Sequence, residues 1–353
     1  MNRTSREVGV GTVRGISEVA RLAGVSKSTA SRALSGHGYV SDESREKVIR
    51  AASSIGFVVS ANAASLVTGR TRNVGVVVPH ISRWFFAEVL EGIERTLIEA
   101  DYDLTLYRLS DDAAKRRRVF EYFLVRKRVD AVISVGISLT SDEVDMLHNL
   151  GKPVVGVGGE INGIATLSID DVAAGRFVTE HLVSLGHERI VHLGDDTDEQ
   201  ADFHVHDRRL AGFWQALDEA GLRHPDDFVR VDYSIPAGYE AALKLLADPD
   251  RRPTAIVAGC DAIAIGAITA ARQLGIQVPS QLSVIGIDGH DLAPMFGLTT
   301  LEQEPAKQGE LAVKAVLERL AHNDSDPAND RMVMPVSLAV RSSTMAPPAE
   351  QPA

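Results

Sequence analysis

From residue 73 onward, short apolar runs alternate with segments of helical periodicity, and this alternation restricts the fold more than any other feature of the sequence. Each run is four or five mostly apolar residues long, as expected of parallel strands that are covered on both faces. The runs span 74–78, 104–107, 131–135, 153–157, 190–193, 228–231, 255–258 and 284–287. Helices between successive strands predict an α/β fold with doubly wound parallel sheets.

The strand and helix alternation restarts after Asp170, which predicts two similar lobes. The intervening helices are expected at 86–100, 113–126, 173–185, 209–220, 237–246 and 262–274. Segments near 295–304 and 325–335 are expected to be crossovers between the lobes, and a helix at 308–320 should lie on the first lobe. Lobe one would then hold 73–168 and 302–330, and lobe two 169–300 and 331–345. A small ligand is expected in the cleft at the carboxyl ends of the strands.

The first 58 residues have a different pattern, with three short amphipathic helices expected at 16–23, 27–34 and 42–55. Gly24 interrupts the first pair, and Ser26 and Ser41 precede the second and third helices as N-caps, because a serine hydroxyl can accept a free backbone N–H. Gly56 is a natural stop after the third helix. Two short helices joined by a glycine-containing turn predict a helix-turn-helix DNA-binding domain over residues 15–58.

Charge is divided unevenly along the chain, although its 353 residues carry a net charge of −11. Residues 1–72 hold eleven Lys and Arg against five Asp and Glu, and the remainder holds 26 against 43. A basic module on an acidic body is typical of a DNA-binding head joined to a domain with another task. The outward face of the second helix carries Lys27, Ser28, Thr29, Ser31 and Arg32. Arginine can pair with guanine there, while the alternative is an ordinary solvated helix face.

The stretches 16–36 (ISEVARLAGVSKSTASRALSG) and 40–48 (VSDESREKV) resemble the headpiece signature of the lactose-repressor (LacI/GalR) family, and landmarks of that family recur to about residue 344. The resemblance implies a two-lobed body like a periplasmic binding protein, which binds an effector and dimerises over residues 73–345. It also implies that Lys27, Ser28 and Arg32 face bases, and that Ser26, Thr29 and Ser31 hold phosphates.

Residues 59–72 match the hinge of that family, a segment that folds on operator DNA. The resemblance implies that Leu66 inserts into the minor groove and kinks the duplex; the alternative is a plain linker residue. Val59 and Ser60 stand where the family usually has Pro-Asn, and Ala64 where Arg or Gln is frequent, so fewer DNA contacts are expected from the hinge.

The effector residues also follow from the resemblance. It implies that aromatic side chains and charged groups together hold a hydroxyl-rich ligand, most simply a sugar. The positions that match are Phe85, Phe86, Arg209, Tyr233, Asp261 and Asp288. Alternatives remain for several of them: the phenylalanines as core residues, Asp261 as a helix N-cap, and Arg209 as a partner of nearby acids only. Gly158 and Cys260 replace strong polar groups that the family often has, so an uncommon ligand is expected.

The remaining signals predict a cytoplasmic protein without cofactor, metal or catalytic site, and the family resemblance implies that it is a homodimer. The stretch 195–207 holds His204 and His206 among five aspartates, and a solvated loop is favoured there over a metal site. Cys260 is the only cysteine, and no signal peptide or membrane-spanning run is found. Residues 1–14 and 346–353 are interpreted as disordered tails. The alternatives are a corepressor-dependent regulator, for example one that binds a purine, a solute-binding protein, and a sugar-modifying enzyme.

Overall fold

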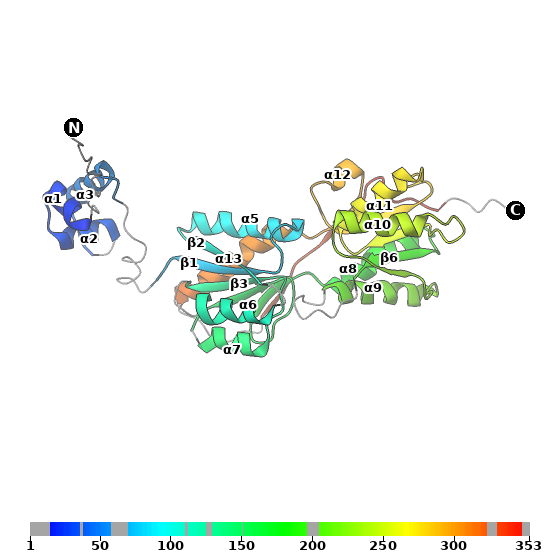
Figure 1. The fold of residues 1–353 in the computed structure, drawn as a ribbon, viewed down its shortest axis with the longest axis horizontal. Helices are drawn as coiled ribbons and strands as arrows, with labels where there is room; N and C mark the ends of the chain where they lie inside the picture. Colours follow the sequence, from blue (N-terminus) through cyan, green and yellow to red (C-terminus); the bar gives the residue numbers. More distant parts are fainter. Residues whose placement is uncertain are drawn as a thin grey trace, which may run out of the picture. The chain divides into compact units, whose positions relative to one another are not determined.

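The computed structural model describes residues 15–35, 38–57, 70–109, 112–124, 129–149, 151–195, 205–322 and 330–347. The chain forms two compact units, Met1–Thr71 and Arg72–Ala353 (Figure 1). Leu66, most of the predicted hinge and nearly all of both predicted tails lie outside the described residues.

The first unit is the predicted bundle of three helices. They are α1 (Ile16–Ala23), α2 (Lys27–Ser35) and α3 (Asp42–Ser54). Gly24 ends α1 in the left-handed conformation at φ 67°, which gives the chain the tight turn into α2. The predicted caps are confirmed, because Thr29 N donates to Ser26 Oγ at 3.1 Å and Ser44 N donates to Ser41 Oγ at 3.4 Å.

The helices of the first unit bury one small apolar cluster. Its buried members are Val19, Ala20, Ala30, Ala33, Val40, Val48, Ala51 and Ala52. Ala30 and Ala33 are the buried residues of α2, and Leu34 packs at the margin of the cluster. Because these side chains are small, α2 lies close to α1 and α3, and its polar side chains occupy the opposite face.

The second unit contains two six-stranded sheets, one in each lobe. The first sheet has the order β11-β5-β4-β3-β1-β2 and the second β12-β10-β9-β8-β6-β7. The strands of the first sheet are β1 (Asn73–Val78), β2 (Asp103–Arg108), β3 (Ala131–Val135), β4 (Val154–Val157), β5 (Ala165–Ser168) and β11 (Arg331–Val333). Those of the second are β6 (Ile190–Gly194), β7 (Phe228–Arg230), β8 (Ala255–Ala258), β9 (Ser283–Asp288), β10 (Thr299–Glu302) and β12 (Ser337–Ala339). Every pairing is parallel except that of β10 with β12.

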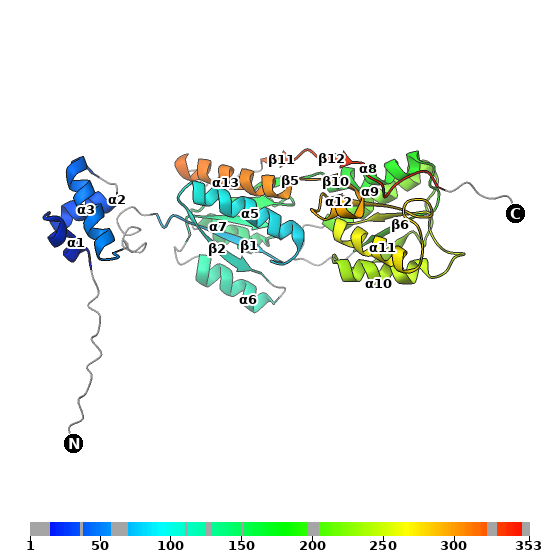
Figure 2. The same ribbon diagram turned by 90° about the horizontal axis from the view of Figure 1, so that it is seen from above.

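Helices cover both faces of each sheet, as the apolar runs predicted. The helices are α5 (Trp84–Glu99), α6 (Ala113–Arg118), α7 (Ser141–Asn149), α8 (Asp171–Ser184), α9 (Val205–Ala220), α10 (Ile235–Leu246), α11 (Asp261–Gln273), α12 (Ala293–Phe296) and α13 (Pro305–His322), with a π-helical turn η1 at Val119–Leu124. In the first sheet, Val76 and Ile133 face α5 and α13, whereas Val77 and Val132 face η1 and α7. In the second, α8 and α9 lie on one face and α10 and α11 on the other (Figures 1 and 2).

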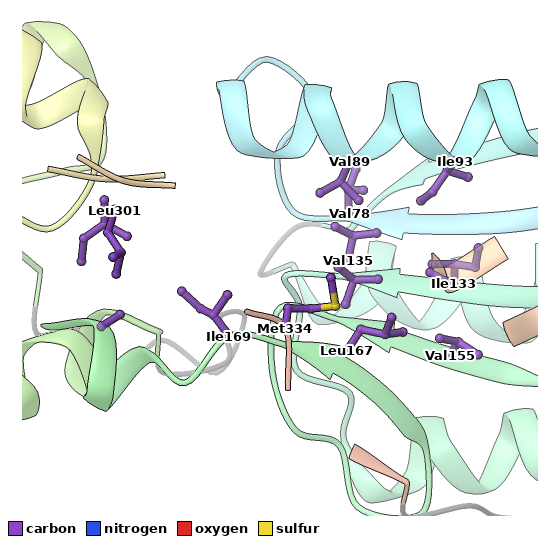
Figure 3. Close-up of a cluster of buried hydrophobic side chains, with 14 of the residues drawn as sticks. Val78, Val89, Ile93, Ile133, Val135, Val155, Leu167, Ile169, Leu301 and Met334 are labelled. Atoms are coloured by element: carbon purple, nitrogen blue, oxygen red, sulfur yellow. The ribbon is translucent and has the colours of Figure 1, made fainter. Parts of the chain in front are cut away.

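Three segments pass between the lobes and are packed by apolar side chains. Figure 3 shows Ile169 after β5, Leu301 in β10 and Met334 after β11 as members of one buried cluster. Because this cluster is continuous from Val89 in α5 to Leu182 in α8, the two lobes share a core at the crossovers. The lobes are therefore joined by packed segments rather than by loose linkers.

Four strands were not predicted, and two of them correct the lobe boundaries. β5, β10, β11 and β12 are only three or four residues long, and β11 is exposed throughout, so none has a strong apolar signal. β11 pairs with β5, which places residues 331–333 in the first lobe rather than the second. β10 pairs with β9 up to Glu302, so the segment predicted as a crossover near 295–304 includes a strand of lobe two.

The helix α13 lies on the first lobe, as predicted, and its contact with α5 is unusually close. A Cβ atom built on Gly309 would lie 2.2 Å from the carbonyl oxygen of Val89, and one on Gly92 would lie 2.0 Å from that of Ala306. Only glycine allows two helix backbones to approach this closely. The N-terminus of α5 and that of α13 are thereby held together, and both contribute side chains to the cleft described next.

Candidate functional site

A cavity of about 630 Å³ lies between the two lobes of the second unit, at the carboxyl ends of their strands. Its wall on the first lobe comes mainly from the segment after β1 and from the N-termini of α5 and α13. Its wall on the second lobe comes from α8, α9 and the segments after β6, β7, β8 and β9. Five of the predicted effector residues line it together: Phe85, Phe86, Arg209, Tyr233 and Asp288.

Arg209, in α9, is the buried charge at the centre of the cleft. Its Nε donates to Asp171 Oδ1 at 3.0 Å, and its Nη1 donates to the carbonyl of Gly259 at 2.6 Å and to Asp288 Oδ1 at 3.4 Å. Burial alone would lower the pKa of Arg209. The nearby carboxylates of Asp171 and Asp288 have the larger combined effect and raise that pKa above its usual value. The guanidinium therefore stays charged and is held in one orientation by acids from α8 and β9.

Asp288 ends β9 and has a strained backbone. Its φ is 137°, which non-glycine residues rarely adopt, and strain of this kind is concentrated at functional sites. Gln303 Nε2 donates to Asp288 Oδ1 at 2.7 Å, and the Gln303 backbone N donates to the Asp288 carbonyl at 3.3 Å. Burial raises the pKa of Asp288, while the charge of Arg209 works in the opposite direction. The carboxylate is thus fixed by two side chains from different elements.

Asp261 does not line the cleft, contrary to the expectation from the resemblance. It is fully buried as the first residue of α11, and the N-cap position belongs to Cys260. Its Oδ2 accepts from the backbone N of Gly289 at 3.0 Å and of His290 at 2.8 Å, and its Oδ1 accepts from Thr300 Oγ1 at 2.6 Å. Burial, helped by the charge of Asp288, raises the pKa of Asp261. Through these bonds Asp261 stabilises the loop that follows β9.

Aromatic rings form much of the cavity wall. Phe85 and Phe86 meet edge to face at 5.4 Å, and the ring of Tyr233 lies 3.7 Å from that of His206. Both phenylalanines line the cavity and also pack against the core. Apolar ring faces next to buried charged groups can hold a ligand that is itself part apolar and part polar.

Among the contacts between the lobes are two side-chain contacts at the cleft that were not predicted. Trp84, at the start of α5, stacks on His290 of the second lobe at 4.7 Å, and Arg83 Nη2 lies 2.8 Å from Asp232 Oδ1. Trp84 and His290 stand next to predicted residues in sequence, but no local pattern indicates that they meet. Asp171, Gln303 and Gln308 were also missed, because each lies on an element whose position relative to Arg209 depends on the tertiary fold.

The two departures from the family pattern also face the cleft. Gly158 and Cys260 both line the cavity. Burial raises the pKa of the Cys260 thiol, which favours its neutral form. Neither residue brings a charge into the cavity.

The predicted DNA-contacting residues lie together on α2 and at its start. Ser26, Lys27, Ser28 and Arg32 are exposed, while Thr29 and Ser31 are half-buried. The Ser26 hydroxyl lies 2.8 Å from those of Ser28 and Thr29, so the hydroxyl groups form one patch at the N-terminus of the helix. An exposed helix N-terminus with hydroxyl donors and two cations has the chemistry of a surface for phosphates and base edges. Leu66 lies outside the described residues.

Within the part of the chain that the structure describes, no group of three or more metal-ligating side chains occurs and no helix is long and apolar enough to cross a membrane. Residues 196–204, including His204, are not among those described. His206 lines the cleft and Asp195 pairs with Arg230 at 2.9 Å.

A helix-turn-helix head and a two-lobed body with a ligand-sized cleft define a class of protein, the transcription regulators with an effector-binding domain. Residues 15–60 match the lacI family of bacterial regulatory proteins, and residues 179–344 match the periplasmic binding protein-like domain. The HTH-type transcriptional repressor PurR of Mannheimia succiniciproducens is 32% identical over 316 residues, which are 88% of this chain and 93% of PurR. The chain belongs to the lacI family, whose members are regulators rather than enzymes.

Solved structures resemble the whole chain. The lac repressor dimer bound to operator and the anti-inducer ONPF has a TM-score of 0.81 at 23% identity, covering 94% of this chain and 99% of that one, and shows the same fold. The complex of the transcriptional regulator CelR with cellobiose has a TM-score of 0.65 at 26% identity, covering 93% of this chain and 99% of that one.

Proposed function

We propose that this protein is a dimeric repressor that binds a pseudo-palindromic operator and releases it when a neutral, hydroxyl-rich effector, a sugar, fills the cleft. The observation that carries the proposal is the buried Asp171–Arg209–Asp288 cluster beside an aromatic wall. Charged groups make stronger hydrogen bonds to hydroxyls than neutral groups do, and ring faces suit the apolar faces of a pyranose.

The charge of the cleft supports a neutral ligand. Three arginines, Arg83, Arg108 and Arg209, line it together with four aspartates, which are Asp171, Asp195, Asp232 and Asp288. Arg83 is paired with Asp232, and Arg209 is paired with both Asp171 and Asp288. These pairs leave little positive charge to attract an anionic ligand. A volume of about 630 Å³ is within the range of small-molecule sites and is large enough for a mono- or disaccharide. The likeness to the complex of the regulator CelR with cellobiose points in the same direction.

The DNA-binding half of the proposal rests on α2. Lys27, Ser28 and Arg32 would reach base edges in the major groove, and Ser26, Thr29 and Ser31 would bind phosphates. The hinge residue Leu66 would enter the minor groove between two half-sites. Two copies are needed because one three-helix head covers a single half-site, and the lac repressor is likewise bound to its operator as a dimer.

Coupling of the two halves follows from linkage. An effector that binds the DNA-free shape more tightly than the DNA-bound shape must lower the affinity for operator. A ligand that prefers the DNA-bound shape would act as a corepressor instead.

The DNA-binding half is tested by selecting operator sequences from a random DNA pool and measuring their affinity by fluorescence anisotropy. Arg32→Met is expected to cost about 1–3 kcal/mol and to relax the preference at one base pair of each half-site. Lys47→Met is the matched control, because Lys47 is an exposed cation of the same unit that pairs with Glu43 on α3. Selection of no palindromic sequence, or equal losses in both variants, would refute the assignment of α2 as the recognition helix.

A further inference from the structure

Gln308, in α13, is a buried polar residue in the effector cleft that the sequence did not single out. Its side chain has no exposed surface, yet it lines the cavity from the side of the first lobe. Its Oε1 atom has no hydrogen-bond partner among the described residues. A buried amide oxygen without a partner is unfavourable, which makes it a candidate for a group that a ligand completes.

The orientation of the Gln308 amide follows from its neighbours. The side-chain atom 2.8 Å from the Gln303 carbonyl must be the donor Nε2, because a backbone carbonyl can only accept. The same Nε2 also lies 3.2 Å from Gln303 Oε1. Gln303 in turn uses its own Nε2 to donate to the carboxylate of Asp288 at 2.7 Å, which leaves its Oε1 free to accept. The chain of donors is therefore consistent from Asp288 to Gln308, and an exchange of oxygen and nitrogen at either amide would place like atoms together.

This chain of hydrogen bonds connects the two lobes. Arg209 and Asp288 belong to the second lobe, Gln303 lies between β10 and α13, and Gln308 belongs to a helix of the first lobe. Of the two glutamine amides, only that of Gln308 has an oxygen without a hydrogen-bond partner among the described residues. Trp84 Nε1, which lacks a partner among the described residues and also lines the cavity from the first lobe, offers an unused donor on the same lobe.

We propose that Gln308 is an effector-binding residue whose Oε1 accepts a hydrogen bond from a hydroxyl or N–H group of the ligand. The contact would connect the ligand through Gln303 to Asp288 and Arg209, so one bound molecule would touch the polar groups of both lobes. This inference rests on the proposed function, since it needs the cleft to be an effector site. It deepens that proposal by requiring a donor group on the ligand at the first-lobe side and by disfavouring an anionic group there.

The test compares wild type, Gln308→Met and Gln215→Met, all as the full chain. Methionine has nearly the length of glutamine without its hydrogen bonds, and Gln215 is an exposed residue of α9 that serves as the matched control. D-glucose, D-ribose, cellobiose and hypoxanthine are each titrated by isothermal calorimetry, and the melting temperature of each ligand-free protein is recorded. For any compound that binds, Gln308→Met is expected to raise Kd about five- to tenfold, since a hydrogen bond is worth roughly that factor, while Gln215→Met leaves Kd unchanged.

The outcomes separate this inference from the proposed function. Binding of equal strength to wild type and Gln308→Met would overturn the role of Gln308 and leave the effector cleft standing. If none of the four compounds binds wild type, that result counts against the proposed function and against this inference together, because the inference needs a ligand in the cleft. The ligand-free melting temperatures show whether Gln308→Met remains folded during the titration, since the variant also loses the hydrogen bonds that Gln308 Nε2 donates to Gln303.

Discussion

Replacing Arg209 by methionine is the substitution for which the structure predicts the largest and most specific effect. The change removes the cation from between two buried acids, and with it the hydrogen bonds that Arg209 donates to Asp171, to Asp288 and to the Gly259 carbonyl. Breaking a buried ion pair by removing one partner costs about 3–5 kcal/mol of folding free energy. The control is Arg176→Met. Arg176 also has two acidic partners, Glu180 and Glu219, but its side chain is 42% exposed, so the expected loss is below about 1 kcal/mol.

The effect of Arg209→Met should also depend on pH in a known direction. The charge of Arg209 lowers the pKa of Asp288, so its removal raises that pKa further above the value in the unfolded chain. The folded variant then holds a proton that the unfolded chain has lost, and it gains stability relative to wild type as the pH falls. The unfolding free energy that the variant lacks relative to wild type should therefore be smaller at pH 5 than at pH 7.5, by about 1–2 kcal/mol.

Urea unfolding followed by tryptophan fluorescence measures the unfolding free energy of the unit that contains Arg209. Both tryptophans, Trp84 and Trp214, lie in the second unit, so the signal reports the effector domain and not the head. A loss below about 1 kcal/mol at pH 7.5, or a deficit that grows on acidification, would refute the assignment of Arg209 as a compensated buried cation.

Three further effects follow from buried positions. Gly309→Ala should destabilise the second unit by about 1–3 kcal/mol in urea unfolding, because its Cβ would meet the Val89 carbonyl at 2.2 Å; an unchanged midpoint would show that the helices can separate freely. Burial lowers the pKa of His192 to about 3, so its contribution to stability, present above pH 6.5, is lost as the pH falls. His192→Leu should remove about 2 kcal/mol of the acid-induced loss between pH 6.5 and 5, and equal pH slopes would contradict this. Asp261→Ala should cost at least about 3 kcal/mol by leaving three donors unpaired, and Asp261→Asn distinctly less; equal losses in the two variants would argue against the support role.

The sequence predicted the elements whose local signal is strong. The eight apolar runs and the helices between them were located to within a few residues, and the serine caps of α2 and α3 are confirmed. The short strands β5, β10, β11 and β12 were missed because they pair at or near sheet edges with few apolar residues of their own. Their pairing is decided by the tertiary fold, and sequence periodicity does not report it.

The cleft was predicted in part for the same reason. The resemblance placed Arg209 and Asp288 at the cleft, where both line the cavity, whereas the carboxylate of Asp261 binds the backbone of residues 289 and 290 instead. Gln303 and Gln308 carry no motif, and their role depends on hydrogen bonds between elements distant in sequence.

The most direct test of the regulatory account is the operator affinity of the full-length protein in the presence and absence of a ligand. Fluorescence anisotropy on the selected operator is measured alone and with D-glucose, D-ribose, cellobiose or hypoxanthine at saturating concentration. The account predicts that a sugar weakens operator binding by about 5- to 150-fold, the usual range of allosteric coupling, and that Arg209→Met abolishes this response. Tighter binding with hypoxanthine would show a corepressor instead of an inducer. An operator affinity that no small molecule changes, in a protein whose cleft binds one of them, would contradict the account.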